Sequence, residues 1–111
     1  MSVLDENIAK LDGYLARFGD KGILNHIAGE DLAGSGGVFQ TISPVNKSVI
    51  CDVALGAATD IDAAANAAHD AFATWRDMPA SERKKIILRI AEGIEARAEE
   101  IALCECWDTG Q

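Results

Sequence analysis

The first part of the chain carries hydrophobic residues at helical spacing. The apolar positions are separated by three or four residues and are Leu4, Ile8, Leu11, Leu15 and Phe18. This spacing places all five side chains on one face of an amphipathic helix. Gly19 and Gly22 follow, and glycine is typical of the left-handed backbone at a helix end. The pattern predicts a helix over residues 3–18.

A β-like pattern follows this helix. Residues 38–42 and 48–55 are rich in strand-forming side chains, and the polar break between them contains Pro44 and Asn46. Two such runs joined by a short polar loop predict a β-hairpin. A short apolar stretch ahead of the hairpin, residues 23–27, is also β-like and ends in a turn signal.

An alanine-rich segment predicts the second helix, over residues 60–76. Thr59 is placed to cap this helix, with Asp62 three residues later in the capping-box arrangement. The small alanines allow another helix to approach closely, whereas Phe72 and Trp75 give one end of the helix larger apolar side chains.

A longer helix is predicted over residues 80–106, after Pro79. One of its faces is apolar at helical spacing and consists of Ile86, Ile87, Ile90, Ile94, Ala98, Ile101 and Ala102. The run Asp108-Thr109-Gly110 then ends the helical pattern, because glycine is a natural helix stop.

These elements together indicate an α+β fold made of one helix, one β-hairpin and two long helices. We expect three divisions along the chain. They are an N-terminal helical extension at residues 1–22, a β-hairpin region at residues 23–57 and a helical pair at residues 58–111.

The composition narrows the class of protein. Hydrophobic residues make up 49% and charged residues 25% of the 111 residues, which is typical of a globular chain. The net charge of −8 argues against a nucleic-acid partner, because phosphate binding needs clustered Lys and Arg. No apolar run is long enough to cross a membrane. Three cysteines without a signal peptide fit free thiols in the cytoplasm.

Several residues invite a chemical role that their context does not support. A phosphate-binding glycine loop should follow a strand and open a helix, whereas residues 34–37 precede a strand, so we expect a plain turn. Cys104 and Cys106 are separated by one residue, which turns their side chains about 200° apart on a helix and disfavours a zinc site. Cys51 lies in a predicted strand without an activating base nearby in sequence. Neither histidine, His26 or His69, lies in a motif, so we interpret both as ordinary surface residues.

The order of the segments resembles the amino-terminal region of the aldehyde dehydrogenase family. The similarity is carried by Ile27-Ala28-Gly29-Glu30, Phe39-Gln40-Thr41-Ile42-Ser43-Pro44, Ala54-Leu55-Gly56, Asp60-Ile61-Asp62-Ala63-Ala64, Ala71-Phe72-Ala73-Thr74-Trp75, Ser81-Glu82-Arg83, Ile94-Glu95 and Asp108-Thr109-Gly110-Gln111. Each motif is short, but their order over residues 23–111 is specific. Two residues depart from the family pattern. Ser43 replaces the usual Asn, and Lys47 occupies a position where a turn glycine is common.

Within the family, two features are similar to the 5-carboxymethyl-2-hydroxymuconate semialdehyde dehydrogenases, which act in aromatic catabolism. They are the helix ahead of the opening strand and the final segment, residues 104–111. This resemblance implies an α/β enzyme that binds NAD or NADP, oxidises an aldehyde to the carboxylic acid and forms a homo-oligomer, either a dimer or a tetramer.

In the family, a cysteine thiolate attacks the aldehyde, hydride passes to NAD(P)⁺ and a glutamate-activated water releases the acid. The motifs that supply these groups and bind the nucleotide lie beyond the segment that this chain resembles. We therefore expect no catalytic and no cofactor-binding residue here, and no Rossmann-like core. The expected chain is an N-terminal, non-catalytic portion of such an enzyme.

The resemblance also implies one ligand site. Several relatives bind a monovalent cation, K⁺ or Na⁺, near the hairpin and the "D-T-G" turn, and the matching residues are Thr41, Ile42 and Asp108. Oxygen ligands suit such a hard cation. The alternative is that Asp108 only ends the helix and accepts hydrogen bonds from local amides. Two other functions also stay open for the whole chain, namely a non-catalytic interaction module that associates through its amphipathic helices and a regulatory binder of a small ligand.

Overall fold

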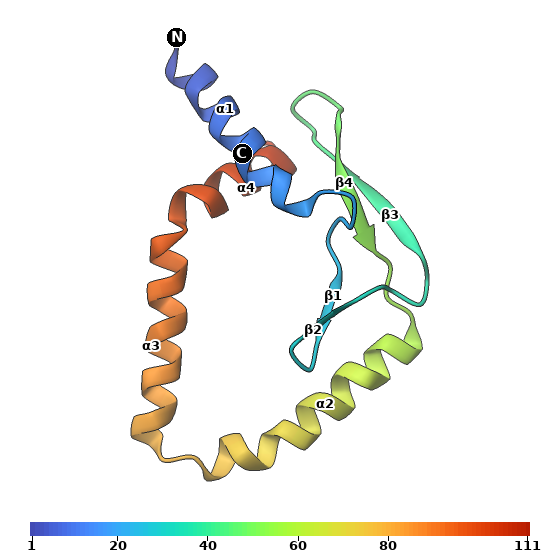
Figure 1. Ribbon diagram of the computed structural model, residues 1–111, viewed down its shortest axis with the longest axis vertical. Coiled ribbons are helices and arrows are strands. Elements are labelled where there is room, and N and C mark those ends of the chain that lie inside the picture. Colours follow the sequence, from blue (N-terminus) through green and yellow to red (C-terminus); the bar gives the residue numbers. More distant parts are fainter.

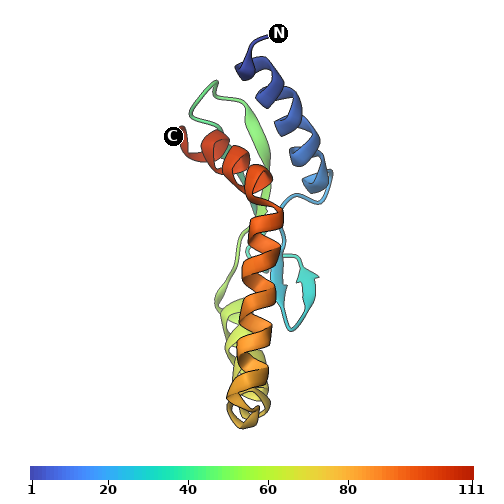
Figure 2. The ribbon, with the colours of Figure 1, turned by 90° about the vertical axis from the view of Figure 1, so that its left-hand side faces the viewer.

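The computed structural model describes all 111 residues as an open arch. In Figure 1, two long helices form the far limbs of the arch, and the first and last helices lie together near a β-hairpin. Figure 2 shows the same arch edge-on, where it is thin. Its extents are 53 × 36 × 21 Å and its radius of gyration is 17.5 Å, compared with about 13 Å for a compact domain of similar length.

The first helix, α1 (Val3–Leu15), begins with a capping box. The Ser2 Oγ accepts a hydrogen bond from the Asp5 amide at 3.2 Å, and the Asp5 carboxylate accepts one from the Ser2 amide at 3.0 Å. A 3-10 turn, η1 (Ala16–Phe18), completes the helix. The predicted helix over residues 3–18 is therefore confirmed, and Leu11 on its apolar face is buried.

Two antiparallel hairpins follow. The predicted hairpin is confirmed as β3 (Val38–Ile42) paired with β4 (Val49–Ala54), with a bulge at Thr41/Ile42. The structure adds a smaller hairpin, β1 (Asn25–Ile27) paired with β2 (Glu30–Leu32). The first strand lies within the β-like stretch expected at residues 23–27, whereas the second strand was not predicted. The reason is that β2 consists mainly of polar residues, whereas the hairpin is specified by its two-residue turn, in which both residues have positive φ.

The turn between β3 and β4 places a lysine in left-handed backbone. Lys47 has φ of +64°, a region that costs an L-residue roughly 1–2 kcal/mol. Its neighbour Asn46 supports the turn, because the Asn46 Oδ1 accepts hydrogen bonds from the Ser48 amide at 3.0 Å and the Ser48 hydroxyl at 2.7 Å. The departure from the family glycine therefore falls at the strained position itself.

We expect Lys47→Gly to stabilise the chain. Glycine adopts positive φ without a Cβ clash, so the free energy of unfolding should rise by about 0.5–1 kcal/mol, after the greater freedom of the unfolded glycine is subtracted. Urea unfolding followed by circular dichroism measures the change. Lys21→Gly is the matched control, because Lys21 is an exposed loop lysine without positive φ. Equal stabilisation by both substitutions would contradict the prediction.

The second helix, α2 (Ala58–Asp77), begins two residues earlier than predicted, and the cap expected at Thr59 and Asp62 is wrong. The earlier start places Asp60, not Asp62, at the third helical position. The Asp60 carboxylate accepts a hydrogen bond from the Ala57 amide at 2.8 Å. Thr59 lies inside the helix, and its hydroxyl donates to the Ser35 hydroxyl at 3.1 Å.

The long helix predicted over residues 80–106 is two helices, α3 (Ala80–Ala96) and α4 (Ala98–Thr109). Arg97 interrupts them with φ of −117° and ψ of 21°. Its guanidinium binds the Glu100 carboxylate at 2.9 and 3.0 Å, and α4 turns toward α1. As predicted, Gly110 ends the helix, in left-handed backbone with φ of +78°.

Little of the chain is buried. Only Leu11, Ser43 and Cys51 are buried, and neither α2 nor α3 contains a buried residue. The accessible surface is 8124 Å², whereas size scaling gives about 5,900 Å² for a compact monomer of this mass. None of the helices combines the length and the hydropathy needed to span a bilayer.

Candidate functional site

The fold brings together two of the three residues that the sequence analysis assigned to a cation site. Thr41 lies on β3 and Asp108 at the end of α4, and the Thr41 hydroxyl donates a hydrogen bond to the Asp108 Oδ1 at 2.7 Å. Ile42 follows Thr41 at the bulge, and its side chain is about half exposed. The alternative role for Asp108, accepting from local amides, is not what the structure shows, because its partner is 67 residues away in sequence.

The end of α4 is held against the β3–β4 turn by a buried serine. Ser43 has no exposed surface. Its hydroxyl donates to the Trp107 carbonyl at 2.6 Å and accepts from the Val45 amide at 3.2 Å. A Cβ on Gly110 would lie only 3.0 Å from Pro44, so the chain also packs closely here. Ser43, a departure from the family pattern, therefore supplies the polar link that keeps Asp108 beside Thr41.

A cavity of about 510 Å³ opens beside this pair. Apolar side chains from α1, the hairpin and the region before the hairpin form most of its wall. The polar part comes from α4 and from Thr41. The lining residues are Leu15, Phe18, Ile23, Phe39, Thr41, Ile50, Val53, Cys104, Glu105, Asp108 and Thr109. Its volume falls within the range of about 300–1,000 Å³ that is usual for small-molecule sites.

The donor set suits a weakly held monovalent cation better than a divalent metal. Asp108 and Glu105 form no ion pair, and both lie near the negative end of the α4 dipole. No group of three His, Cys, Asp or Glu side chains is close enough to hold a metal ion. A cation here would have the Asp108 carboxylate and would need main-chain carbonyls for its other ligands.

Two of the three cysteines lie in surroundings that do not activate a thiol. Burial raises the pKa of the Cys51 thiol on β4 and that of the Cys104 thiol on the cavity wall. A raised pKa lowers the thiolate fraction at neutral pH. All three cysteines are free. A histidine contacts a carboxylate on the exposed β1–β2 hairpin, away from the cysteines, where the His26 Nδ1 lies 2.8 Å from the Asp31 Oδ1.

The glycine-containing loop at residues 34–37 is a turn that binds α2. Asp60 accepts hydrogen bonds from the Ser35 amide and hydroxyl, both at 2.8 Å. These bonds and the one from the Ala57 amide, which is the largest cause, lower the pKa of Asp60. A Cβ on Gly34 would lie 2.2 Å from the Leu55 carbonyl oxygen, so the glycine permits close backbone packing. The carboxylate occupies the amides that an anionic ligand would use.

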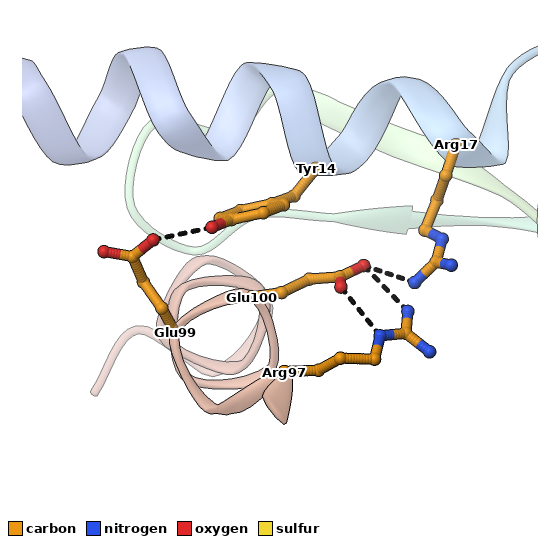
Figure 3. A network of polar contacts seen from close by, with 5 residues as sticks. All are labelled: Tyr14, Arg17, Arg97, Glu99 and Glu100. Carbon is orange, nitrogen blue, oxygen red and sulfur yellow. Dashed lines mark hydrogen bonds and ion pairs between the residues drawn. The ribbon is translucent and has the colours of Figure 1, made fainter. Parts of the chain in front are cut away.

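A polar network between α1 and α4 was not foreseen in the sequence. Lys10 Nζ lies 2.7 Å from the Glu99 Oε1, and the Tyr14 hydroxyl donates to the Glu99 Oε2 at 2.6 Å. Arg17 binds the Glu100 carboxylate, which also accepts from Arg97 (Figure 3). The network is readable in retrospect, because the three donors on α1 and η1 are spaced four and three residues apart. Their acceptors are adjacent glutamates.

Comparison with known proteins gives a consistent result. The aldehyde dehydrogenase family profile matches residues 32–111. An aldehyde dehydrogenase from Vibrio cholerae is 42% identical over 88 residues, which is 78% of this chain and 17% of the relative. A mitochondrial benzaldehyde dehydrogenase from Antirrhinum majus is 46% identical over 81 residues, which is 71% of this chain and 15% of the relative. This chain thus spans about a sixth of the length of these relatives.

A solved structure is also similar. The crystal structure of HpcC from Thermus thermophilus matches with a TM-score of 0.86 and 38% sequence identity, covering 94% of this chain and 20% of that chain. The similarity extends beyond the matched family region, since a match over 94% of the chain must include part of α1.

Proposed function

The chain belongs to the aldehyde dehydrogenase family, and on that basis we propose that it forms the N-terminal portion of an NAD(P)-dependent aldehyde dehydrogenase. The observation that carries the proposal is the match to residues 32–111 together with the close structural similarity over 94% of the chain. The proposed reaction of the whole enzyme is oxidation of an aldehyde to a carboxylic acid. NAD(P)⁺, when bound, accepts the hydride.

The finer proposal is that the aldehyde is 5-carboxymethyl-2-hydroxymuconate semialdehyde. Two features of the chain support it, namely the helix ahead of the first strand and the resemblance of residues 104–111. We further propose that the whole enzyme is a cytoplasmic homo-oligomer, a dimer or tetramer. Residues 1–22 would form its N-terminal extension, residues 23–57 its hairpin region and residues 58–111 the start of its cofactor-binding domain.

The open shape of the chain supports its being part of a larger protein. The apolar side chains of α2 and α3 are mostly exposed, and the accessible surface is well above that of a compact monomer. In the proposed enzyme these faces pack against the rest of the cofactor domain. This chain would then position the domain, and we assign no catalytic role to Cys51, Cys104 or Cys106.

A chimera tests the proposal. Residues 1–111 would replace the matching segment of the Vibrio cholerae relative. We expect the chimera to reduce NAD⁺ or NADP⁺ when an aldehyde is added, whereas the 111-residue chain alone should not. Isothermal titration of the chain alone should give no stoichiometric NAD binding in the micromolar range. A folded but inactive chimera, or tight NAD binding by the chain alone, would contradict the proposal.

The same exposed helices favour a second candidate, a non-catalytic module that associates through α2 and α3. The chimera separates the two candidates. A module with surfaces evolved for another partner would not restore the fold of the relative, whereas a family segment should.

We also propose that Thr41, Ile42 and Asp108 bind K⁺ or Na⁺ in the whole enzyme. The contact between Thr41 and Asp108 supports this site. In the chimera, K⁺ at ten times its dissociation constant should stabilise the protein by about 1.4 kcal/mol, and Asp108→Ala should remove that gain. Thermal melting at constant ionic strength, with choline replacing K⁺, measures it. Asp62→Ala, at an exposed position of α2, is the matched control. An unchanged K⁺ response in Asp108→Ala would exclude the site.

A further inference from the structure

The N-terminal helix contacts α4 through polar side chains as well as apolar ones. Its C-terminal half lies beside the start of α4, at Glu99 and Glu100, and its N-terminal half beside the end of α4, so the two helices run antiparallel. Of its apolar side chains only Leu11 is buried, whereas Val3 and Leu4 are about 70% exposed. The first turn of this helix therefore leaves much of its apolar surface uncovered.

The polar contacts gather at one place. Two adjacent glutamates in the first turn of α4 bind three side chains of α1 and η1. We call these five residues the ionic latch: Lys10, Tyr14, Arg17, Glu99 and Glu100. Lys10 and Glu99 are half exposed, so salt reaches them, whereas Glu100 is only 16% exposed between Arg17 and Arg97. Such contacts weaken as the ionic strength rises, because the screening length falls from about 10 Å at 0.1 M salt to about 3 Å at 1 M.

The residues that follow α1 and η1, from Gly19 to Gly22, connect the helix to the hairpin and could act as a hinge. Gly19 and Gly22 both have positive φ, at 39° and 66°. Immediately after them, Ile23 is fixed to β4, because its amide donates to the Asp52 carbonyl at 2.8 Å and its carbonyl accepts from the Ala54 amide at 2.8 Å. Gly22 is itself packed against β4, since a Cβ there would lie 2.1 Å from the Asp52 carbonyl oxygen. A movement of α1 about residues 19–21 would therefore leave the hairpin in place.

The end of α1 is also one wall of the 510 Å³ cavity. Leu15 and Phe18 line it from α1 and η1, and Cys104 lines it from α4. We propose that the ionic latch holds α1 as a removable wall, so that release of the latch opens the cavity beside Thr41 and Asp108. This inference goes beyond the proposed activity and does not depend on it, since it rests on contacts within this chain.

The thiol of Cys104 reports on the opening. In a Cys106→Ser background, its labelling by the uncharged reagent iodoacetamide is followed by peptide mapping. Cys51, which is buried on β4 and does not line the cavity, reports unfolding of the whole chain in the same sample. Single exposed ion pairs contribute weakly, and loss of the three latch contacts together should raise the Cys104 labelling rate about tenfold.

The variants isolate the latch. Glu99→Gln/Glu100→Gln should label rapidly at low salt and lose the salt dependence that the parent shows between 0.05 and 1 M NaCl (roughly the range over which screening acts). Glu82→Gln is the control, because it removes a comparable exposed pair, with Lys85, away from the latch. Lys10→Glu should also label rapidly, and Lys10→Glu/Glu99→Lys should restore protection by reversing the pair.

Two results would overturn the inference. One is equal Cys104 labelling in the parent and the double glutamine variant at low salt, with unchanged helix content by circular dichroism. The other is a parallel rise of Cys51 labelling, which would mean that the whole chain opens. If the glutamine variant does not fold, the variant Lys10→Glu/Glu99→Lys provides the test. Cys104 labelling in this variant as fast as in Lys10→Glu alone would exclude the latch.

Discussion

At micromolar concentration the 111-residue chain by itself is expected to sediment as dimers or larger assemblies and to melt over a broad temperature range. The reason is the apolar surface that α2 and α3 leave uncovered. The large side chains on these helices that are at least one-third exposed are Ile61, Phe72, Trp75, Ile87, Leu88, Ile90 and Ile94. Exposed apolar surface of this extent promotes association.

The expected strength of self-association follows from the accessible surface area of the chain. The accessible surface of 8124 Å² exceeds by about 2,200 Å² the value of about 5,900 Å² from size scaling. That excess is similar to the surface buried in stable interfaces, about 2,000–5,000 Å² in total for obligate ones. Covering each half-exposed isoleucine is worth about 1 kcal/mol. Several such residues amount to a large part of the roughly 5–15 kcal/mol that stabilises a typical domain.

Analytical ultracentrifugation over a range of concentrations, together with thermal melting, measures the association. Ile90→Lys should weaken it, since it places a charge in the apolar face of α3. Glu92→Gln changes the net charge by the same amount at a polar position of that helix and should leave the association unchanged. A monomer at every concentration with a sharp transition at high temperature would contradict this prediction and favour a self-sufficient module.

Gly22→Ala is expected to be the most destabilising single methyl addition near α1. Gly22 has φ of +66°, and a Cβ there would lie 2.1 Å from the Asp52 carbonyl oxygen and 2.8 Å from its carbonyl carbon. These atoms cannot move freely, because the same oxygen accepts the Ile23 amide at 2.8 Å. The left-handed backbone and the forced shift together should lower the free energy of unfolding by about 2–5 kcal/mol.

Gly13→Ala is the matched control. Gly13 lies inside α1, and a Cβ there would meet no atom within 4 Å. The substitution should stabilise the chain by about 0.5–1 kcal/mol, because alanine favours the helix. Urea unfolding at a fixed, low protein concentration compares the two variants. Midpoints that shift in the same direction would show that the close approach at Gly22 does not control stability.

The elements that depend on local patterns could be predicted from the residues alone. The apolar spacing of residues 3–18 predicted α1 and η1, the strand formers on either side of Pro44 predicted β3 and β4, and Gly110 predicted the end of α4. These features follow from side-chain periodicity and backbone preference within a few residues, which any stretch of sequence carries. The ordered motifs also indicated the family, because they span most of the chain.

How these elements pack against one another could be seen only in the folded chain. Nothing local breaks the helical pattern at Arg97, yet the chain turns there, and the glutamates that follow bind α1. The resemblance to the family predicted Thr41 and Asp108 as cation ligands. Their direct hydrogen bond, by contrast, depends on the buried Ser43, which holds α4 against the hairpin. Contacts between residues more than 60 positions apart depend on the path of the whole chain, and periodicity within one segment does not contain that path.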